Sequence, residues 1–440
     1  MTVGTAHAAP PATAGRPAHR DGNVLRWLAA YTASMVGDNV YYIALSWAAV
    51  RAGTPSQAGL VMAVSAVPRA LLMLGGGVVA DRFGPRKVVI GSDAVRCAAV
   101  LAVAALLFAS EPGLWLLALL ALVFGTVDAV FMPAVGALPA RVTTRGQLAR
   151  VQGMRGLAIR FANVVGAPLG GLGVAVGGAA AAFGLAGLLI AVSVPLLVSV
   201  RMRALPVDAS EGAAASDGAD ASGASEGVDG KTAGEASRTA WRDLRDGLRY
   251  IRRHPVLAPL IVAIALGDLG FVGPLNVGLA LLADQRGWGA SGMGWVLAGF
   301  GTGAGLVSLL LTARGRLPHA GRVMSVAILL GCVAIGSLAY VPGVAVAVGV
   351  ALLVGLLAGL SGALCGALLQ TETDPAYLGR VSAVAGLVSL GFAPLSMPVS
   401  AAAIGLWGTG PVFVVSAAVC GLGGVVALCS PPLRRAELPR

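Results

Sequence analysis

The sequence predicts an all-α integral membrane protein with twelve transmembrane helices arranged as two six-helix bundles. The first reason is composition: 57% of the 440 residues are hydrophobic and only 12% are charged, whereas ordinary globular domains are about 25% charged. The second is that the apolar residues form runs of membrane length. The third is that basic residues gather at alternate connections between these runs.

The apolar runs give two equal sets of spans. A helix needs about 20 apolar residues to cross the hydrocarbon core of a bilayer. The first set lies at 24–50, 56–80, 88–109, 113–138, 148–174 and 176–200, and the second at 256–284, 290–313, 321–341, 345–371, 376–401 and 406–430. The break between the fifth and sixth spans is expected at Gly177-Gly178. The halves 24–200 and 256–430 are near-equal in length, which predicts a parallel internal repeat.

The distribution of basic residues predicts the orientation of the spans. With both termini in the cytoplasm, thirteen basic residues lie on the cytoplasmic side and two on the other side, and this asymmetry is typical of inner-membrane proteins. The thirteen are Arg82, Arg86, Lys87, Arg141, Arg145, Arg150, Arg314, Arg316, Arg322, Arg380, Arg434, Arg435 and Arg440, and the two are Arg51 and Arg286.

Three segments are expected outside the membrane. Residues 1–23 contain no apolar stretch typical of a signal peptide and are expected to form a disordered cytoplasmic tail, as is 431–440 at the other end. Between the halves lies a cytoplasmic linker, 201–255, in which 205–240 is acidic and poor in large apolar residues. Its end, 241–253, places Trp241, Leu244, Leu248 and Ile251 at helical spacing between arginines. It is expected to lie as an amphipathic helix on the membrane surface, or alternatively to extend the span 256–284.

Several classes of function are disfavoured. The five cysteines lie inside apolar runs without ligand spacing, so we expect no metal and no cofactor. The net charge of +11 is spread in small groups, which favours contact with a lipid bilayer rather than with nucleic acid. The sequence contains no HExxH motif, and its G-x-S-x-G string at Gly223–Gly227 lies in the acidic linker, where no strand-to-helix elbow is expected, so we expect no enzyme.

The run Gly77-Val-Val-Ala-Asp-Arg-Phe-Gly-Pro-Arg-Lys87 lies between the second and third spans. It matches G-x-x-x-D-[RK]-x-G-x-[RK]-[RK], the loop signature of the major facilitator superfamily of secondary transporters, which the chain resembles over 24–430. Gly77 is expected to let helices approach closely, and Gly84 to permit a tight turn. The resemblance implies that Asp81 helps to hold a cytoplasmic gate. Arg82, Arg86 and Lys87 are expected to anchor the loop at the membrane surface.

Two further stretches resemble the exporting branches of this superfamily. Gly166-Ala-Pro-Leu-Gly-Gly171 is similar to the end of an antiporter motif, in which Pro168 is expected to kink the helix and Gly166, Gly170 and Gly171 to permit close packing. Gly37-Asp38-Asn39 and 241–255 resemble the macrolide-efflux and enterobactin-exporter-like branch. The resemblance implies a monomeric exporter in the bacterial inner membrane. Its substrates would be hydrophobic or amphipathic small molecules, exchanged for protons. Uptake or facilitated diffusion of a metabolite, and a non-transporting scaffold or sensor, remain alternatives.

Four ionisable residues lie midway along predicted spans: Asp38, Asp128, Arg160 and Asp268. A charge at the bilayer centre costs at least about 2.5–3.5 kcal/mol, so such residues usually face a cavity or a partner. The resemblance implies that the first, fourth and seventh spans line a central cavity, which would gather the three aspartates there together with Asn39.

We expect these carboxyl groups to exchange protons, with Arg160 as their counter-charge. Alternatively, Arg160 forms a static ion pair with Asp38 or Asp128. A second group, Arg69, Asp93 and Arg96, is expected nearer the helix ends, where the charged groups reach the membrane surface.

Overall fold

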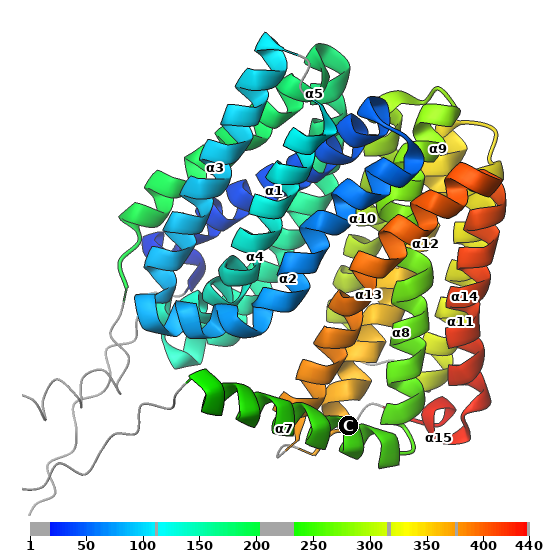
Figure 1. Cartoon of the computed structure of the whole chain (residues 1–440). Coiled ribbons are helices and arrows are strands. Elements are labelled where there is room, and N and C mark those ends of the chain that lie inside the picture. The colour runs from blue at the N-terminus through cyan, green and yellow to red at the C-terminus, as the bar shows by residue number, and fades with distance from the viewer. Residues whose placement is uncertain (1–17, 111–112, 203–232, 315–317, 375–376, 438–440) are drawn as a thin grey trace, which may run out of the picture.

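The computed structural model describes residues 18–110, 113–202, 233–314, 318–374 and 377–437, and these residues form helices without any strand (Figure 1). The N-terminal half contains α1 (Gly22–Ala52), α2 (Pro55–Phe83), α3 (Pro85–Ala109), α4 (Leu114–Val142) and α5 (Leu148–Ser199). The C-terminal half contains α8 (Leu257–Gly273), α9 (Leu279–Gln285), α10 (Gly289–Arg314), α11 (Ala320–Ser337), α12 (Val344–Thr371), α13 (Leu378–Trp407) and α14 (Thr409–Cys429). Short elements are η1 (Ala18–Arg20), η2 (Arg145–Gln147), η3 (Pro274–Gly278), η4 (Leu338–Tyr340) and α15 (Pro431–Arg434).

The 52 residues of α5 form two helices that meet at Gly177 and Gly178. A straight helix of this length would measure about 78 Å, more than twice the thickness of a hydrocarbon core. The backbone leaves helical geometry at Gly177 (φ −142°, ψ 24°) and at Gly178 (φ 70°, ψ −170°), and the second conformation favours glycine. The expected boundary is therefore confirmed.

Each half of the described chain contains six long helices once α5 is divided and α8, η3 and α9 are taken as one. Eight helices are long and apolar enough to cross a membrane by length and composition. The other long helices are α1, α2 and α13, and also α7 (Ala233–Arg253), which is rich in arginine. Asp38 and Asn39 lie within α1. The protein is therefore an all-helical, multi-pass membrane protein.

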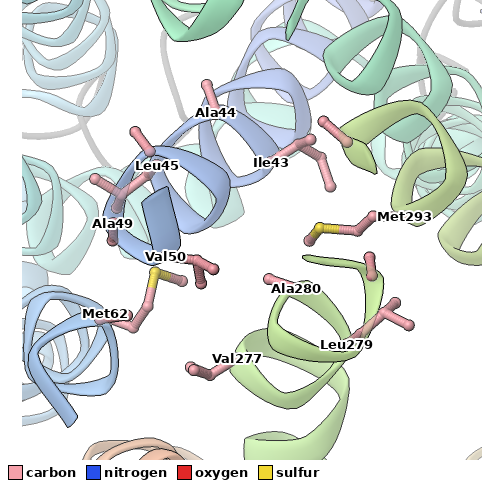
Figure 2. Packing of buried hydrophobic residues seen from close by; sticks show 14 of the residues in the cluster. Ile43, Ala44, Leu45, Ala49, Val50, Met62, Val277, Leu279, Ala280 and Met293 are labelled. Atoms are coloured by element: carbon pink, nitrogen blue, oxygen red, sulfur yellow. The ribbon is translucent and has the colours of Figure 1, made fainter. Parts of the chain in front are cut away.

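The two halves meet at one end of the molecule, which we call the α9 end after the helix found there (Figure 1). One buried apolar cluster at this end contains residues of both halves. In Figure 2, Ile43 and Val50 of α1 and Met62 of α2 lie across from Val277 and Met293 of the C-terminal half. At the opposite end, the α7 end, each half has a buried apolar cluster of its own. Among the described residues, the buried apolar cluster shared by the two halves therefore lies at the α9 end.

Small residues let helices from different halves approach closely. A Cβ atom built on Gly171 of α5 would lie 2.5 Å from the carbonyl oxygen of Ala290, and one built on Gly294 of α10 would lie 2.6 Å from that of Ala167. Neither distance is possible for a real side chain. Close backbone packing of this kind is how transmembrane helices gain van der Waals contact without a hydrophobic driving force.

The helix α7 (Ala233–Arg253) crosses the α7 end and packs on the C-terminal half (Figure 1). Tyr250 stacks on Tyr377 with ring centroids 4.5 Å apart, Ile251 is buried, and Gly247 lies against the backbone of Arg380. Leu248 remains exposed. Part of the apolar face of this helix, at Leu244 and Ile251, thus packs on the C-terminal half, where the helix contacts α8 and α13. Its expected place on the membrane surface stays a prediction.

Three segment boundaries differ from those expected. Residues 233–240, assigned above to the linker, form the first turns of α7. Within the expected N-terminal tail, Ala18 is buried and its N–H donates to Gln147 Oε1 at 3.1 Å, and α1 begins at Gly22. Within the expected C-terminal tail, Leu433 of α15 is buried against α11. These segments are short, but their apolar residues have helix surfaces to pack on. Residues 1–17 and 203–232 lie outside the described part of the chain.

The glycine that brings α2 close to a neighbouring helix is Gly76, whereas we expected Gly77. A Cβ atom on Gly76 would lie 2.1 Å from the carbonyl oxygen of Ala129 in α4, whereas one on Gly77 would have no described atom within 4 Å. Sequence spacing alone cannot separate two adjacent glycines, because the rotation of the helix decides which one faces its neighbour.

We expect Gly76→Val to destabilise the protein by about 1–3 kcal/mol, because an overpacked contact forces the two helices apart. The matched control is Gly77→Val, which makes the same change one position along and should leave stability nearly unchanged. Thermal unfolding of the two purified variants in detergent measures the difference. Equal melting temperatures for both variants would show that the α2–α4 contact is not tight at this position.

Candidate functional site

A network of buried charges surrounds the guanidinium group of Arg96. Its Nη1 donates to Asp38 at 2.9 and 3.1 Å and to Asp128 at 3.0 Å, and its Nη2 donates to Asp93. The exposed fractions of these side chains are 0% for Arg96, 1% for Asp93, 9% for Asp128 and 13% for Asp38. One cation buried among three carboxylates is thus the electrostatic centre of the N-terminal half.

Helical spacing places the members of this network. Ser34, Asp38 and Tyr42 are four residues apart in α1 and therefore share one face. Asp93 and Arg96 are one turn apart in α3. Asp128 reaches the same point from α4. The network thus ties three helices together at mid-length.

Hydroxyl and aromatic groups complete the surroundings of the network. Ser34 Oγ donates to Asp93 at 3.1 Å and accepts from Arg96 at 3.2 Å, and Ser193 donates to the other Asp93 oxygen. The ring of Phe131 lies 3.9 Å from the guanidinium carbon of Arg96, a cation–π contact that stabilises a desolvated cation. Asp93 is therefore satisfied on both oxygens and serves as the fixed partner of Arg96.

Asp128 also extends the network beyond Arg96, to Tyr42 and Arg69. Its second oxygen accepts from the Tyr42 hydroxyl at 3.3 Å and lies 3.8 Å from Arg69 Nη1. Arg69 in turn donates to the Tyr42 hydroxyl at 3.4 Å. Three aspartates and two arginines leave one formal negative charge in excess, so a single proton would neutralise the group.

The counter-charge of Asp38 and Asp128 is Arg96, and not Arg160 as expected. The expectation that Asp93 and Arg96 reach the membrane surface is also wrong, because Arg96 lies midway along α3 and is fully buried. Sequence reasoning missed Ser34, Tyr42, Arg69 and Ser193 as members of the network. The four-residue spacing in α1 and the Asp93–Arg96 pair were the signals that could have revealed the shared face.

A cavity of about 630 Å³ lies beside the C-terminal half. Arg160 and Asn163 of α5 form one side of it, and Asp268 of α8 lies on another. It runs from Phe300 and Asn163 towards Leu369 and Ser382, near the α7 end. None of its described lining residues belongs to the Arg96 network, so Asp268 and Arg160 are separate from Asp38 and Asp128.

A smaller cavity of about 210 Å³ lies between the halves and shares Asn163, Phe300 and Gly301 with the larger one. Tyr42 and Asn39 of α1 line it as well. Asn39 Nδ2 donates to Asn163 Oδ1 at 3.2 Å. This row of polar groups leads from the larger cavity through Asn163 and Tyr42 to Asp128.

The predicted gating motif occupies the turn between α2 and α3 at the α7 end. Gly84 joins the two helices with φ +83°, as expected for a turn that needs glycine. Arg86 donates to the carbonyl oxygen of Val198 and so fastens the start of α3 to the end of α5. Arg82 and Lys87 are exposed. The Asp81 side chain lies outside the described part of the chain, so its gating role stays a prediction.

The predicted motif in α5 forms contacts on two sides. Cβ atoms on Gly166 and Gly170 would lie 2.5 Å from Asn39 and 2.9 Å from Ile43 of α1, and Gly171 faces α10 of the other half. Close packing by these three glycines is as expected. The helix continues through Pro168, since the non-helical residues inside α5 are Gly177 and Gly178. The kink expected at Pro168 stays a prediction.

The profile of the Major Facilitator Superfamily matches residues 27–392 of the chain. The fold is similar to that of the nucleoside transporter NupG, with TM-score 0.67 at 14% identity over 94% of this chain and 100% of that one. It is also similar to a D-xylose-proton symporter, with TM-score 0.69 at 12% identity over 94% and 99%. A third similar structure is the peptide transporter POT in complex with sulfate, with TM-score 0.67 at 12% identity over 95% and 96%. No curated protein has a sequence that matches the chain.

We expect Arg96→Gln to destabilise the protein by about 3–5 kcal/mol, because it leaves three buried carboxylates without their cation. Thermal unfolding in detergent measures the loss. Arg160→Gln is the matched control: it removes an arginine from the same depth of the bundle, but one that makes no ion pair among the described residues. If both variants unfolded at the same temperature, Arg96 would not be the partner on which the network depends.

Proposed function

The chain belongs to the Major Facilitator Superfamily and is a membrane transporter, and we propose that it exports hydrophobic or amphipathic small molecules in exchange for protons. The observation that carries this proposal is the buried Arg96 network with its one excess negative charge, joined by polar groups to a cavity at the contact between the halves. Its setting is a bacterial inner membrane with both termini in the cytoplasm, as the distribution of basic residues favours.

The packing of the halves supports alternating access with the cavity open to the cytoplasm. At the α9 end the shared apolar cluster and the Arg51–Asp284 ion pair, at 3.3 Å, join the two halves. Ser46 of α1 also donates to the carbonyl oxygen of Asn276 in η3 at 3.1 Å. The α7 end carries most of the basic residues and is the cytoplasmic side in this proposal. The larger cavity extends towards it, where the apolar clusters of the halves are separate.

The Arg96 network is the proposed proton site. With Asp38 and Asp128 both ionised, Arg96 holds α1 and α4 against α3. A proton on either carboxyl group removes its negative charge and so weakens its bond to Arg96, because the bond is then no longer an ion pair. Protonation therefore changes how firmly α1 is held, and α1 carries both Tyr42 and Asn39 towards the smaller cavity. This gives one physical route from a proton to the contact between the halves.

Two other modes of transport use the same geometry. The D-xylose-proton symporter has the same fold, and a symporter also needs a buried proton site. A facilitator needs only the cavity. The glycines of the α5 motif favour export over these two by resemblance to antiporters, so the direction of coupling is the part of the proposal that transport measurements must decide.

We expect Asp38→Asn to abolish any dependence of conformation on pH, because the amide cannot take up the proton. Spin labels on cysteines replacing Arg150 and Arg322 report the distance between the halves at the α7 end, after the native cysteines are exchanged for serine. In the parent protein this distance distribution should change between pH 8 and pH 5, while in the variant it should not. Asp246→Asn, an exposed acid on α7, is the control and should behave as the parent. A variant that still responds to pH would remove Asp38 from the proton site.

We expect everted membrane vesicles containing the protein to accumulate ethidium when respiration acidifies their interior, and to lose it when nigericin collapses the pH gradient. Uptake into these vesicles corresponds to export from the cell. Equilibration that ignores the gradient would indicate facilitated diffusion. Uptake of ethidium into vesicles whose interior is more alkaline than the medium would indicate symport. No movement beyond that of empty vesicles would contradict export of this kind of compound.

A further inference from the structure

The larger cavity holds two opposite charges that do not pair with each other. Asp268 lies on α8 and Arg160 on α5, and both line the cavity. No ion pair joins them in the described part of the chain. Within the described part of the chain, Oδ2 of Asp268 is shielded from solvent and accepts no hydrogen bond. A carboxylate in a largely apolar wall needs a cation beside it, so the charge of Asp268 favours a cationic group that enters the cavity.

Apart from Asn163, the rest of the described wall is apolar or made of small residues. Phe271 and Phe300 lie together at the inner end with ring centroids 5.7 Å apart. Glycine and alanine of α12, at Ala358, Gly359 and Gly362, leave open space along one side. Cavities of about 300–1,000 Å³ with mostly apolar walls and few polar groups are typical small-molecule sites. The volume here falls within that range.

We infer that this cavity binds an amphipathic zwitterion, with an ammonium group at Asp268, an anionic group at Arg160 and an apolar body along Phe271 and Phe300. This names the substrate class of the proposed transporter and rests on that proposal. A ligand with both charges satisfies both walls at once. An uncharged ligand would displace water from the Asp268 carboxylate without supplying a cation, at a cost that disfavours binding.

The inference also separates the two tasks of the protein. Asp268 and Arg160 hold the substrate, whereas Asp38 and Asp128 are already occupied by Arg96 and take the proton. Asn163, Asn39 and Tyr42, which line the smaller cavity, then connect the substrate site to the proton site. A substitution at either site should therefore impair one task and leave the other measurable.

Four fluorescent probes that share a dansyl group test the inference. Nε-dansyl-lysine carries an ammonium and a carboxylate, dansylcadaverine only the ammonium, dansyl-aminohexanoate only the carboxylate, and N-acetyl-dansylcadaverine neither. Binding to the purified protein in detergent is followed by the rise in dansyl fluorescence. We expect dansyl-lysine to bind tightest, by about tenfold over each singly charged probe, since one charge-assisted hydrogen bond contributes that much or more.

Two substitutions assign each preference to its residue. Asp268→Asn should remove the advantage conferred by the ammonium group, and Arg160→Gln the advantage conferred by the carboxylate. Asp268→Glu, which keeps the charge, should retain most of the preference for the ammonium. Asp246→Asn and Arg242→Gln make the same charge changes on the exposed face of α7 and should bind as the parent does.

The outcomes separate the inference from the proposed function. Equal affinities for all four probes, affinity ratios unchanged in both cavity variants, or no saturable binding at all would overturn the inference. These readings need no proton gradient, so they stand even if Asp38→Asn shows that the Arg96 network binds no proton. Conversely, a pH response lost in Asp38→Asn together with indifference to probe charge would leave the proton site intact and remove the zwitterion.

Discussion

The packing of the N-terminal half depends on keeping one buried cation neutralised. Arg96 has no exposed surface, and its guanidinium meets carboxylates from α1, α3 and α4. Desolvating these charges is costly, and only good geometry with several hydrogen bonds offsets the cost. The network therefore fixes the depth and rotation of α1, α3 and α4 more strictly than their apolar surfaces could. A change in its protonation alters the contacts of all three helices at once.

The position of this network explains how a local event could affect the whole molecule. It lies inside one half, away from the larger cavity, but α1 borders both the network and the contact with the C-terminal half. The halves are joined at the α9 end by small residues and apolar side chains, which pack closely but carry few polar bonds (Figure 2). Such a contact can separate and re-form at low cost, whereas the charge network cannot. In the proposed cycle, the Arg96 network keeps the N-terminal half rigid, while the contact between the halves at the α9 end opens and closes.

The differences between expectation and structure have a common cause. Sequence position showed that Asp38, Asp128 and Arg160 lie at mid-depth, but depth is not proximity. Arg160 and Arg96 are both mid-span cations, and only the rotation of α3 and α5 decides that Arg96 faces the aspartates while Arg160 faces the cavity. Helix rotation also decides that Gly76, and not the expected Gly77, contacts α4, since adjacent residues on a helix point about 100° apart.

The sequence by itself determined the fold class, the position of nearly every helix and the break at Gly177-Gly178, because a bilayer demands apolar runs of fixed length and glycine where the backbone leaves helical geometry. It also placed the turn at Gly84 and the close packing of the α5 glycines. The tertiary structure alone decided which charges pair, which stay unpaired in the cavity, and that α7 packs on α8 and α13. Those outcomes depend on contacts between residues far apart in the chain, whose relative rotation no local pattern records.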